Sequence, residues 1–253
     1  MTEQNMSQKP VSSRQKIRRW LLIITILLIP ITIFYISPIV ASMGAKEGIV
    51  TGALLLYILL FIVSLFVARL WCGWLCPMGA CQEVCSPVMK HTVPEGWRNW
   101  IKYGVTALWL GMLAYTFYIA GGVRAVNPFY GTVNGLSITS LQILMMVVII
   151  FSSILIIAFF TGRRGFCHVL CPIAGIMVFG RKIRNAVGWP ALHLEADKDR
   201  CNDCRTCVKE CPMGLDVNGM VRKGEMEKAD CILCASCADA CPQGAISYGV
   251  KGK

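Results

Sequence analysis

Four long apolar stretches, separated by polar and basic segments, occupy the first two thirds of the chain. They run near Leu21 to Val40, Val50 to Ala68, Tyr103 to Ala120 and Ile138 to Phe160. None of them contains Asp, Glu, Lys, Arg or His. Because about 20 apolar residues cross the roughly 30 Å hydrocarbon core of a bilayer, the pattern predicts four transmembrane helices.

The first stretch contains Pro30 and Pro38, which predict a kink there. A neighbouring segment would then have to satisfy the freed backbone carbonyls. A basic segment precedes this stretch, so a cleaved signal peptide is an alternative interpretation. Its apolar run exceeds that of an ordinary signal peptide and three more stretches follow, which favours a retained anchor.

The basic residues are distributed unevenly along the chain, whose formal net charge is +11. Most lie before the first stretch, between the second and third, and after the fourth, whereas the other two connections hold only Lys46 and Arg124. By the positive-inside rule, both termini are expected to be cytoplasmic. No aromatic face accompanies these charges, so we exclude nucleic acid as a partner and assign them to the anionic surface of the lipid bilayer.

The C-terminal segment carries the spacing C-x2-C-x2-C-x3-C-P twice. This is the ligand pattern of two 4Fe-4S clusters, in which the fourth cysteine of each run binds the other cluster. The expected ligand sets are Cys201, Cys204, Cys207 and Cys241 for one cluster, and Cys231, Cys234, Cys237 and Cys211 for the other. A zinc site gives no reason for the third cysteine or the proline, and a reducing cytoplasmic location argues against disulfides.

A second repeat follows the second and fourth apolar stretches. Arg69-x-Trp71-Cys72-x2-Leu75-Cys76-Pro77 recurs as Arg164-x-Phe166-Cys167-x2-Leu170-Cys171-Pro172. Cysteines four apart on a helix lie on one face, and the two helix pairs have the orientation of parallel repeats about an axis along the membrane normal. Four converging thiolates at the membrane surface, from Cys72, Cys76, Cys167 and Cys171, would suit an additional iron-sulfur cluster or another soft metal.

Two questions stay open for these thiols. Free cysteine is often a small buried hydrophobic residue, although repetition of a nine-residue pattern weighs against that interpretation. Cys81 and Cys85 form a further pair that the second repeat lacks. Cys81 and Cys85 either supply metal ligands in place of the cysteines of the second repeat or are ordinary thiols, and we favour ordinary thiols.

Several cofactor classes are excluded by what the chain lacks. None of its three histidines, His91, His168 and His193, lies in an apolar stretch, which excludes a bis-histidine haem in the bilayer. There is no C-x2-C-H haem motif, dinucleotide fingerprint or P-loop. His168 is either a proton acceptor for a quinol or a polar group at the interface, and we favour the second. His193 is expected to be solvated.

These features predict an α-helical polytopic membrane domain with four transmembrane helices in two pseudo-repeated pairs, plus a small α+β two-cluster bacterial-type ferredoxin domain. The expected parts are a cytoplasmic basic N-terminus (1–19), the transmembrane domain (20–162), the second C-x3-C-P motif with an interfacial linker (163–190) and the ferredoxin domain (191–253). In the linker, Arg181, Lys182 and Arg184 are expected to form the basic face of a short helix lying on the membrane.

The order of four apolar stretches, the motifs Cys72-x3-Cys76-Pro77 and Cys167-x3-Cys171-Pro172, and the two-cluster tail resemble the NapH-type ferredoxin membrane subunits. Related modules occur in NosR-like and CcoG-like proteins. The resemblance covers nearly the whole chain. It implies a bacterial inner-membrane protein that transfers electrons between the quinol or quinone pool and a redox partner, commonly a periplasmic reductase system.

The sequence therefore predicts a membrane-bound electron-transfer subunit of a quinol dehydrogenase-like system, with no catalytic residue of its own. Its cofactors carry the redox chemistry, while the protein sets their position and potential. The competing hypothesis is a metal-handling or maturation factor that binds or reduces copper or iron at the membrane cysteines. The 12 methionines lie mostly in apolar runs and form no clear copper-binding motif.

Overall fold

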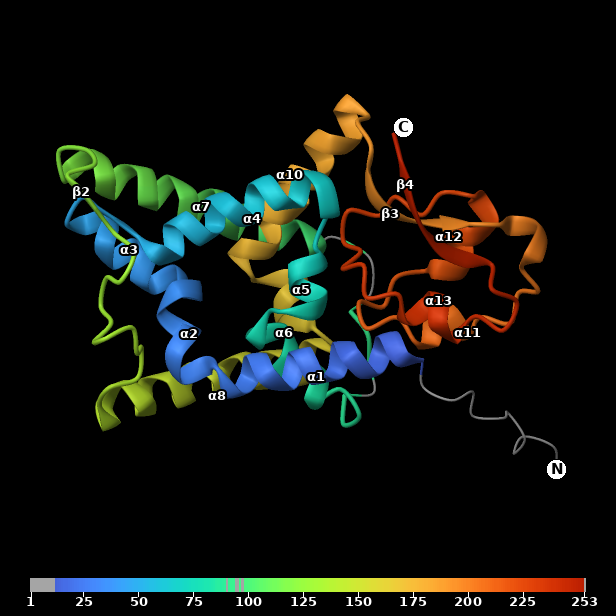
Figure 1. The fold of residues 1–253 in the computed structure, drawn as a ribbon, viewed down its shortest axis with the longest axis horizontal. Coiled ribbons are helices and arrows are strands. Elements are labelled where there is room, and N and C mark those ends of the chain that lie inside the picture. The colour runs from blue at the N-terminus through green and yellow to red at the C-terminus, as the bar shows by residue number, and fades with distance from the viewer. Residues whose placement is uncertain (1–11, 90, 94–95, 97, 253) are drawn as a thin grey trace.

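The structure, a computed structural model, describes residues 12–89, 91–93, 96 and 98–252. It is elongated and mostly helical, with a bundle of long helices at one end and a small α+β unit at the other (Figure 1). One hydrophobic core runs through both, because Tyr57 and Cys72 of the helical part belong to the same buried cluster as Met213 and Cys234 of the α+β unit.

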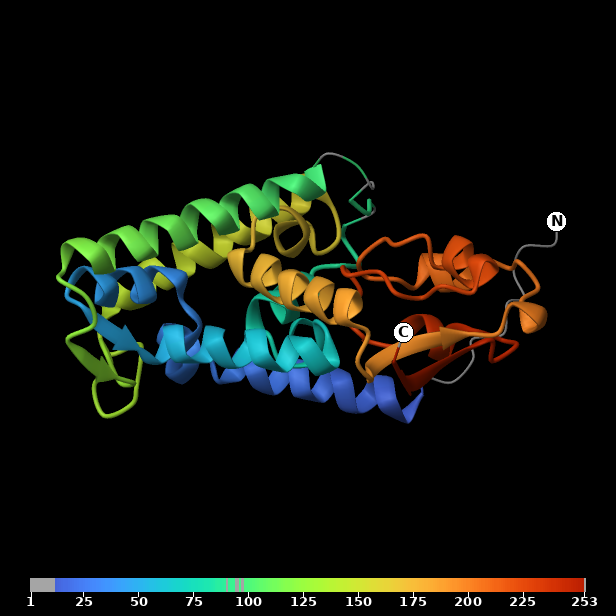
Figure 2. The ribbon, with the colours of Figure 1, turned by 90° about the horizontal axis from the view of Figure 1, so that it is seen from above.

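Four long helices lie at the corners of the bundle and run along its length (Figures 1 and 2). They are α1 (Ser13–Leu27), α4 (Gly52–Val67), α7 (Arg98–Ile119) and α8 (Leu141–Thr161). Side chains cap three of them: Ser12 accepts a hydrogen bond from the Gln15 amide, Thr51 accepts one from the Leu54 amide, and Ser140 accepts one from the Ile143 amide. At the far end, β1 (Ile49–Thr51) pairs in parallel with β2 (Ala125–Asn127).

The first apolar stretch is broken. Helix α1 meets α2 (Ile29–Ile36) at an angle of 86°, and α3 (Pro38–Lys46) follows. Pro30 cannot donate a backbone hydrogen bond, so it ends the ladder of α1. The Phe34 amide donates to Ser137 Oγ at 3.2 Å instead of to the Pro30 oxygen. The amides of Ser137 and Ile138 donate to that oxygen at 3.1 and 3.0 Å. The predicted kink, with a neighbouring segment bonded to the carbonyl it leaves free, is thus confirmed.

Among the described residues, α8 is the one helix that is both long and apolar enough to cross a membrane. A second candidate arises only if α1 and α2 are counted together as one bent span. Helix α4 has 16 residues and is therefore about 24 Å long, and α7 carries several polar and aromatic residues. The structure supports one or two apolar spans rather than establishing four.

Three short helices and one longer helix fill the bundle at the end next to the α+β unit. They are α5 (Leu70–Trp74), α6 (Pro77–Val84), α9 (Gly165–Val169) and α10 (Pro172–Val187). Helix α10 lies between α4 and α7 (Figure 2), where Gly175 abuts Thr106 and Gly180 abuts Ser64 so closely that a Cβ would clash. Helix α10 is therefore an internal helix, and the predicted interfacial helix is wrong.

Two arginines of α10 also differ from the expectation. Arg181 and Arg184 are buried and both pair with Glu227 of the α+β unit, Arg184 at 2.9 Å. They join the two parts of the protein instead of facing lipid headgroups. The burial follows from packing, because α10 contacts α4 and α7 and its basic end reaches Glu227.

The α+β unit is built on two antiparallel strands, β3 (Ala191–Ala196) and β4 (Ile246–Lys251). Between them lie the 3-10 turn η1 (Lys198–Arg200) and the short helices α11 (Thr206–Lys209), α12 (Val217–Lys223) and α13 (Ser236–Ala240). His193, expected to be solvated, is buried on β3 and bonds to the carbonyl of Ala191 through Nδ1. It lies on the face of β3 opposite to Leu194, which lines the core, and β3 contacts α4 of the helical part; the linker composition does not indicate this burial.

Candidate functional site: three groups of four cysteines

The first group of cysteines lines a hollow of about 310 Å³ on the outer side of the α+β unit. Its cysteines are Cys201, Cys204, Cys207 and Cys241. The remaining lining is partly polar and includes Asn202, Arg205 and Asn218. Cys204 is exposed to solvent, so this group reaches the surface of the protein.

The second group lines a hollow of about 380 Å³ on the inner side of the unit. Its cysteines are Cys211, Cys231, Cys234 and Cys237. The other lining residues are almost all apolar, among them Leu194, Met213 and Ile232. Burial raises the pKa of Cys211 to about 11 and that of Cys231 to about 12, so these thiols need a metal to draw them into the thiolate form.

In both hollows the fourth cysteine comes from the other run of the sequence. Cys241 joins the Cys201 loop and Cys211 joins the Cys231 loop. This juxtaposition matches the crossed ligand sets expected from the spacing, and the binding of iron by these residues stays a prediction. A set of four cysteines around one cavity has the donor type that a 4Fe-4S cluster requires.

The third group brings together Cys72, Cys76, Cys167 and Cys171 inside the helical bundle. All four are buried, and the Cys76 thiol lies close enough to the other three to interact electrostatically with each. The two motifs also have the same backbone: the Cys76 amide donates to the Trp71 carbonyl and the Cys171 amide to the Phe166 carbonyl, both at 3.0 Å.

The two cysteines of each motif do not share a continuous helix, contrary to the expectation. Helix α5 ends after Trp74 and α6 begins at Pro77, so Cys76 is an N-cap residue. Cys171 caps α10 in the same way. The proline after each cysteine enforces the break, because it suits the first turn of a new helix and cannot continue the old one.

This break places two of the sulfurs at helix N-termini. Burial raises the pKa of Cys76, and it raises that of Cys171 to about 12, while backbone amides of Gly79 and Ala174 act in the opposite direction. The amides and the helix dipole favour a negatively charged sulfur once a cation is bound. Among the described residues, no three His, Cys, Asp or Glu side chains are spaced to hold one metal ion.

Neighbours of this third group include residues that the sequence did not point to. Met177 of α10 places its sulfur 3.7 Å from Cys72 Sγ, and Gln82 of α6 donates to Cys167 Sγ at 3.1 Å. Cys81 lies on α6 and Cys85 is the C-cap residue of that helix, and both are half-buried. Neither is among the groups that interact electrostatically with Cys76 of the third group. Gln82 and Met177 stand at equivalent positions of the two repeats, five residues after Pro77 and Pro172, and this equivalence is the sequence signal that relates them.

The loop of the second group packs directly on the Cys72 motif. Gly73 lies against this loop, and a Cβ built on it would be 2.4 Å from the carbonyl oxygen of Ile232. Trp74 donates to the Leu233 carbonyl at 3.1 Å, and Gln15 of α1 donates to the Cys234 carbonyl at 2.9 Å. The Cys72 motif and the loop of the second group are thus in direct contact.

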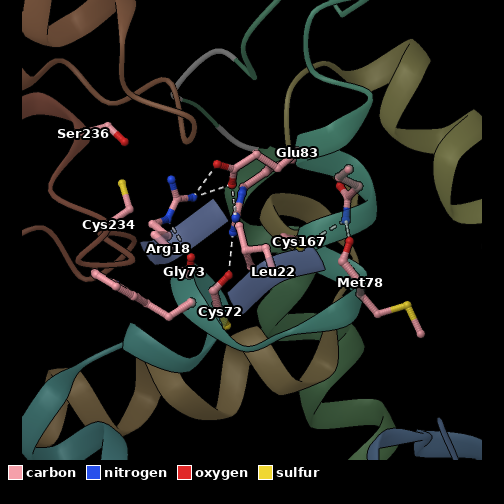
Figure 3. A network of polar contacts seen from close by, with 12 residues as sticks. Arg18, Leu22, Cys72, Gly73, Met78, Glu83, Cys167, Cys234 and Ser236 are labelled. Atoms are coloured by element: carbon pink, nitrogen blue, oxygen red, sulfur yellow. Dashed lines mark hydrogen bonds and ion pairs between the residues drawn. The ribbon is translucent and has the colours of Figure 1, made fainter. Parts of the chain in front are cut away.

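Two buried charge networks flank the same junction. Arg18 of α1 donates to the Gly73 carbonyl at 2.8 Å and pairs with Glu83, as Figure 3 shows beside Cys72 and Gly73. Burial alone would raise the pKa of Glu83, but Arg164 and Arg18 outweigh it and lower that pKa. Asp230 forms the second network with Arg69 and Lys102. These two cations likewise outweigh the effect of burial and lower the pKa of Asp230.

His168 lies inside the protein next to the second network and not on a polar surface. It is 1% exposed, and burial lowers its pKa to about 4. The interpretation as a surface group is therefore wrong. No hydrogen-bond partner reaches its Nδ1 atom among the described residues.

Comparison with known proteins identifies both cysteine-rich regions. The model of a 4Fe-4S dicluster domain matches residues 200–246, and that of a 4Fe-4S binding domain matches 49–93 and 143–190. The second family thus covers both copies of the nine-residue repeat. The chain contains 4Fe-4S domains of two types.

The relatives of the chain include an electron transport protein and a regulatory protein. YccM, a candidate electron transport protein of Escherichia coli (strain K12), is 24% identical over 211 residues, covering 75% of this chain and 56% of YccM. The regulatory protein NosR of Pseudomonas aeruginosa is 27% identical over 66% of this chain and 24% of NosR. RdxA of Cereibacter sphaeroides is 24% identical over 62% of this chain and 38% of RdxA.

The chain therefore spans about half of YccM and smaller shares of the other two. No solved structure gives a significant match. Together the family models and relatives support an electron-transport 4Fe-4S family, without distinguishing the NapH type within it.

Proposed function

We propose that the chain is a membrane-bound iron-sulfur protein of the NapH type, which passes electrons between the quinol or quinone pool and a redox partner. The first and second cysteine groups would each hold one 4Fe-4S cluster, with Cys241 and Cys211 as the crossed ligands. The third group would hold a further iron-sulfur cluster. When bound, such clusters act as one-electron carriers.

The observation that carries this proposal is the order of the three groups in space. The Cys72 motif contacts the loop of the inner group through Gly73 and Ile232, and the inner and outer groups share the small α+β unit. Cys204 of the outer group is exposed. The residues thus form a series from the helical bundle to the protein surface, which suits a carrier that accepts electrons at one end and delivers them at the other.

Membrane residence is supported by the exposed surface of the helices. Only 17% of the apolar window of α8 is buried, and Leu141, Ile149 and Phe160 of this helix are among its strongly exposed residues. A contiguous apolar surface of this kind needs a non-aqueous partner. We propose four membrane-crossing segments, of which the first is the bent α1–α2 pair and the second is the short α4.

The proposed orientation places the α+β unit in the cytoplasm of a bacterial inner membrane. The start of α1 lies at the α+β unit, where Arg14 pairs with Asp239 at 2.9 Å. Both ends of the described chain are therefore on the same side, and the basic connections assign that side to the cytoplasm. The resemblance implies a periplasmic reductase system as the redox partner, and in this orientation such a partner requires a further electron relay across the membrane.

Electron exchange with quinol tests this function. In anaerobically reconstituted protein, we expect a quinol to reduce the clusters or a quinone to reoxidise them after dithionite reduction, followed by visible absorption and EPR. The double variant Cys72→Ser with Cys76→Ser should still react with dithionite but lose the quinol or quinone reaction. Wild-type clusters that dithionite reduces but that exchange no electrons with either quinone form would contradict the proposal.

A second candidate, a metal-handling or maturation factor, has one observation in its favour. The contact between Met177 Sδ and Cys72 Sγ joins two soft ligands that suit Cu(I). Transfer of copper from the protein to an acceptor, without reactivity towards quinol, would support this candidate. Met177→Leu, a volume-conserving change, would then weaken copper binding while leaving cluster reduction unaffected.

A further inference from the structure

The nine-residue repeat begins with an arginine whose role the proposed function does not explain. Arg69 and Arg164 are 0% and 1% exposed. Burying a guanidinium group without compensation is costly, and the Nε atoms of both side chains have no hydrogen-bond partner in the described part of the chain. Two such residues at equivalent positions of a repeat call for a common explanation.

Each of the two arginines donates a hydrogen bond to the motif of the other repeat. Arg69 of the first motif donates through Nη2 to the carbonyl of Cys167 at 3.3 Å. Arg164 of the second motif donates through Nη1 to the carbonyl of Cys72 at 2.6 Å. Each arginine thus holds the backbone of the first cysteine in the other motif. The charge of Arg69 interacts with the thiols of Cys72, Cys167 and Cys171, and that of Arg164 interacts with the thiol of Cys167.

Each arginine also belongs to a group with the same charge. Arg69 and Lys102 share the carboxylate of Asp230, and Arg164 and Arg18 share that of Glu83. Each group has two cations and one carboxylate, so it carries one net positive charge. The two groups come from different parts of the sequence, which makes their equal composition a property of the folded site.

The charge of these groups complements that of a metal held by four thiolates. Four thiolate ligands carry four negative charges, and a bound metal group with two positive charges leaves two negative charges in excess. The two arginine groups supply two positive charges in the same buried region, where charges are poorly screened. The two arginine groups therefore neutralise the two excess negative charges that the oxidised metal group and its four thiolates carry together. The extra negative charge that reduction adds is not neutralised by them.

We propose that the Arg69 and Arg164 groups are built-in countercharges for a metal group bound by Cys72, Cys76, Cys167 and Cys171, and that they set its reduction potential. This inference rests on the proposed third metal site and adds its charge state. The arginines are positioning and tuning residues, since they contact the cysteine backbone and not the metal ligand atoms.

The sign of the effect follows from electrostatics. Reduction adds one negative charge, so removing a nearby positive charge makes reduction harder and removing a nearby carboxylate makes it easier. Arg69→Gln and Arg164→Gln should lower the potential of the third site, whereas Glu83→Gln should raise it. Arg69→Lys keeps the charge but cannot bridge the Asp230 carboxylate and the Cys167 carbonyl as a guanidinium does. It should lose stability while keeping a potential near that of the wild type.

The experiment is a potentiometric EPR titration of the full-length, anaerobically reconstituted protein, with metal content measured on each variant. Arg184→Gln is the matched control, because Arg184 is an equally buried arginine paired with a glutamate, Glu227, at another place in the fold. The expected result is opposite shifts for Arg69→Gln and Glu83→Gln, with an unchanged third-site potential in Arg184→Gln. If the arginine-to-glutamine variants do not fold, the upward shift of Glu83→Gln and the retained potential of Arg69→Lys carry the test.

The countercharge role would be overturned if the third-site potential moved in the same direction in Arg69→Gln and Glu83→Gln. It would also be overturned if that potential stayed constant in both variants while the metal was retained. Wild-type protein with only two clusters and no metal at the four cysteines would overturn both this inference and the third site. In that case, quinol-dependent reduction of the two remaining clusters would still support the electron-transfer function. The two failures are therefore distinguishable.

Discussion

The two cysteine loops of the α+β unit have the same backbone and opposite surroundings. In the outer loop Asp203 and Arg205 adopt left-handed conformations, and in the inner loop Leu233 and Ala235 do so at the equivalent positions. The residues between the outer cysteines are polar and exposed, whereas Leu233 and Ala235 are 2% and 0% exposed. The local conformation thus depends on the cysteine spacing, and the environment depends on the residues between the cysteines.

The difference arises from what each loop faces. The inner loop packs on Gly73 and Trp74 of the helical part, which covers its apolar side chains. The outer loop has no such cover and presents Cys204 to solvent. Because exposure and hydrogen bonds to sulfur both affect cluster potentials, two sites with identical ligand types are expected to differ in potential. Their positions suit the inner site to exchange with the membrane part and the outer site to exchange with a partner.

The largest predicted effect comes from removing one crossed ligand from each site. Cys241→Ser should eliminate the outer cluster, and Cys211→Ser the inner one, each with a loss of about four of roughly eight ferredoxin irons. Iron analysis together with EPR measures the result. The reason is geometric, because each of these cysteines lines the cavity formed by the other run.

The two variants serve as controls for each other. They remove the same chemical group from equivalent positions, so they should differ only in which signal disappears. Loss of the inner signal in Cys241→Ser, with the outer one retained, would show that each run binds its own cluster and would contradict the crossed sets.

A smaller effect is expected at the contact between the inner loop and the bundle. Gly73→Val introduces side-chain atoms where a Cβ alone would lie 2.4 Å from the Ile232 carbonyl oxygen. Overpacking of this kind costs about 1–3 kcal/mol. We expect a lower unfolding temperature and slower quinol-driven reduction, with the iron content of both ferredoxin sites preserved.

Gly104→Val is the matched control for this contact. Gly104 also lies on a helix, and a Cβ there meets no atom within 4 Å. It therefore reports the cost of valine in a helix without the steric conflict. Equal electron-transfer rates in Gly73→Val and the wild type would contradict a route through this junction.

The same comparison explains how much the sequence could predict. The spacing of Cys201, Cys204 and Cys207 is dictated by local ligand chemistry, so the 4Fe-4S assignment required no knowledge of the fold and is supported by the family comparison. The repeat around Cys72 and Cys167 also predicted that the two motifs meet. The interfacial helix predicted after the second motif was wrong, because α10 enters the bundle and carries Arg181 and Arg184 inward, a result of packing that composition does not reveal.

Other features depend on contacts that are distant in sequence. Glu83 and Asp230 were unremarkable acidic residues in the sequence, and their importance appears only when Arg164 and Arg69 reach them across the fold. Met177 was one of many apolar residues until α10 placed it against Cys72. The arginine at the start of each repeat was a visible signal of these networks, since a charged residue recurred at the same position of a largely apolar motif.

The smallest predicted effect concerns a single hydrogen-bond donor at the outer site. Asn218 of α12 places its side-chain nitrogen 3.9 Å from Cys201 Sγ and donates to Asp203 at 3.0 Å. Asn218→Leu removes that donor, and because donors near cluster sulfurs stabilise the more negative, reduced state, the potential of the outer site should fall modestly. Met220→Leu, on the same helix but facing the inner cavity, is the control and should leave the outer potential unchanged in a redox titration. A fall in the inner potential with Asn218→Leu, and none in the outer, would mean that the polar lining of the outer loop does not distinguish the two sites.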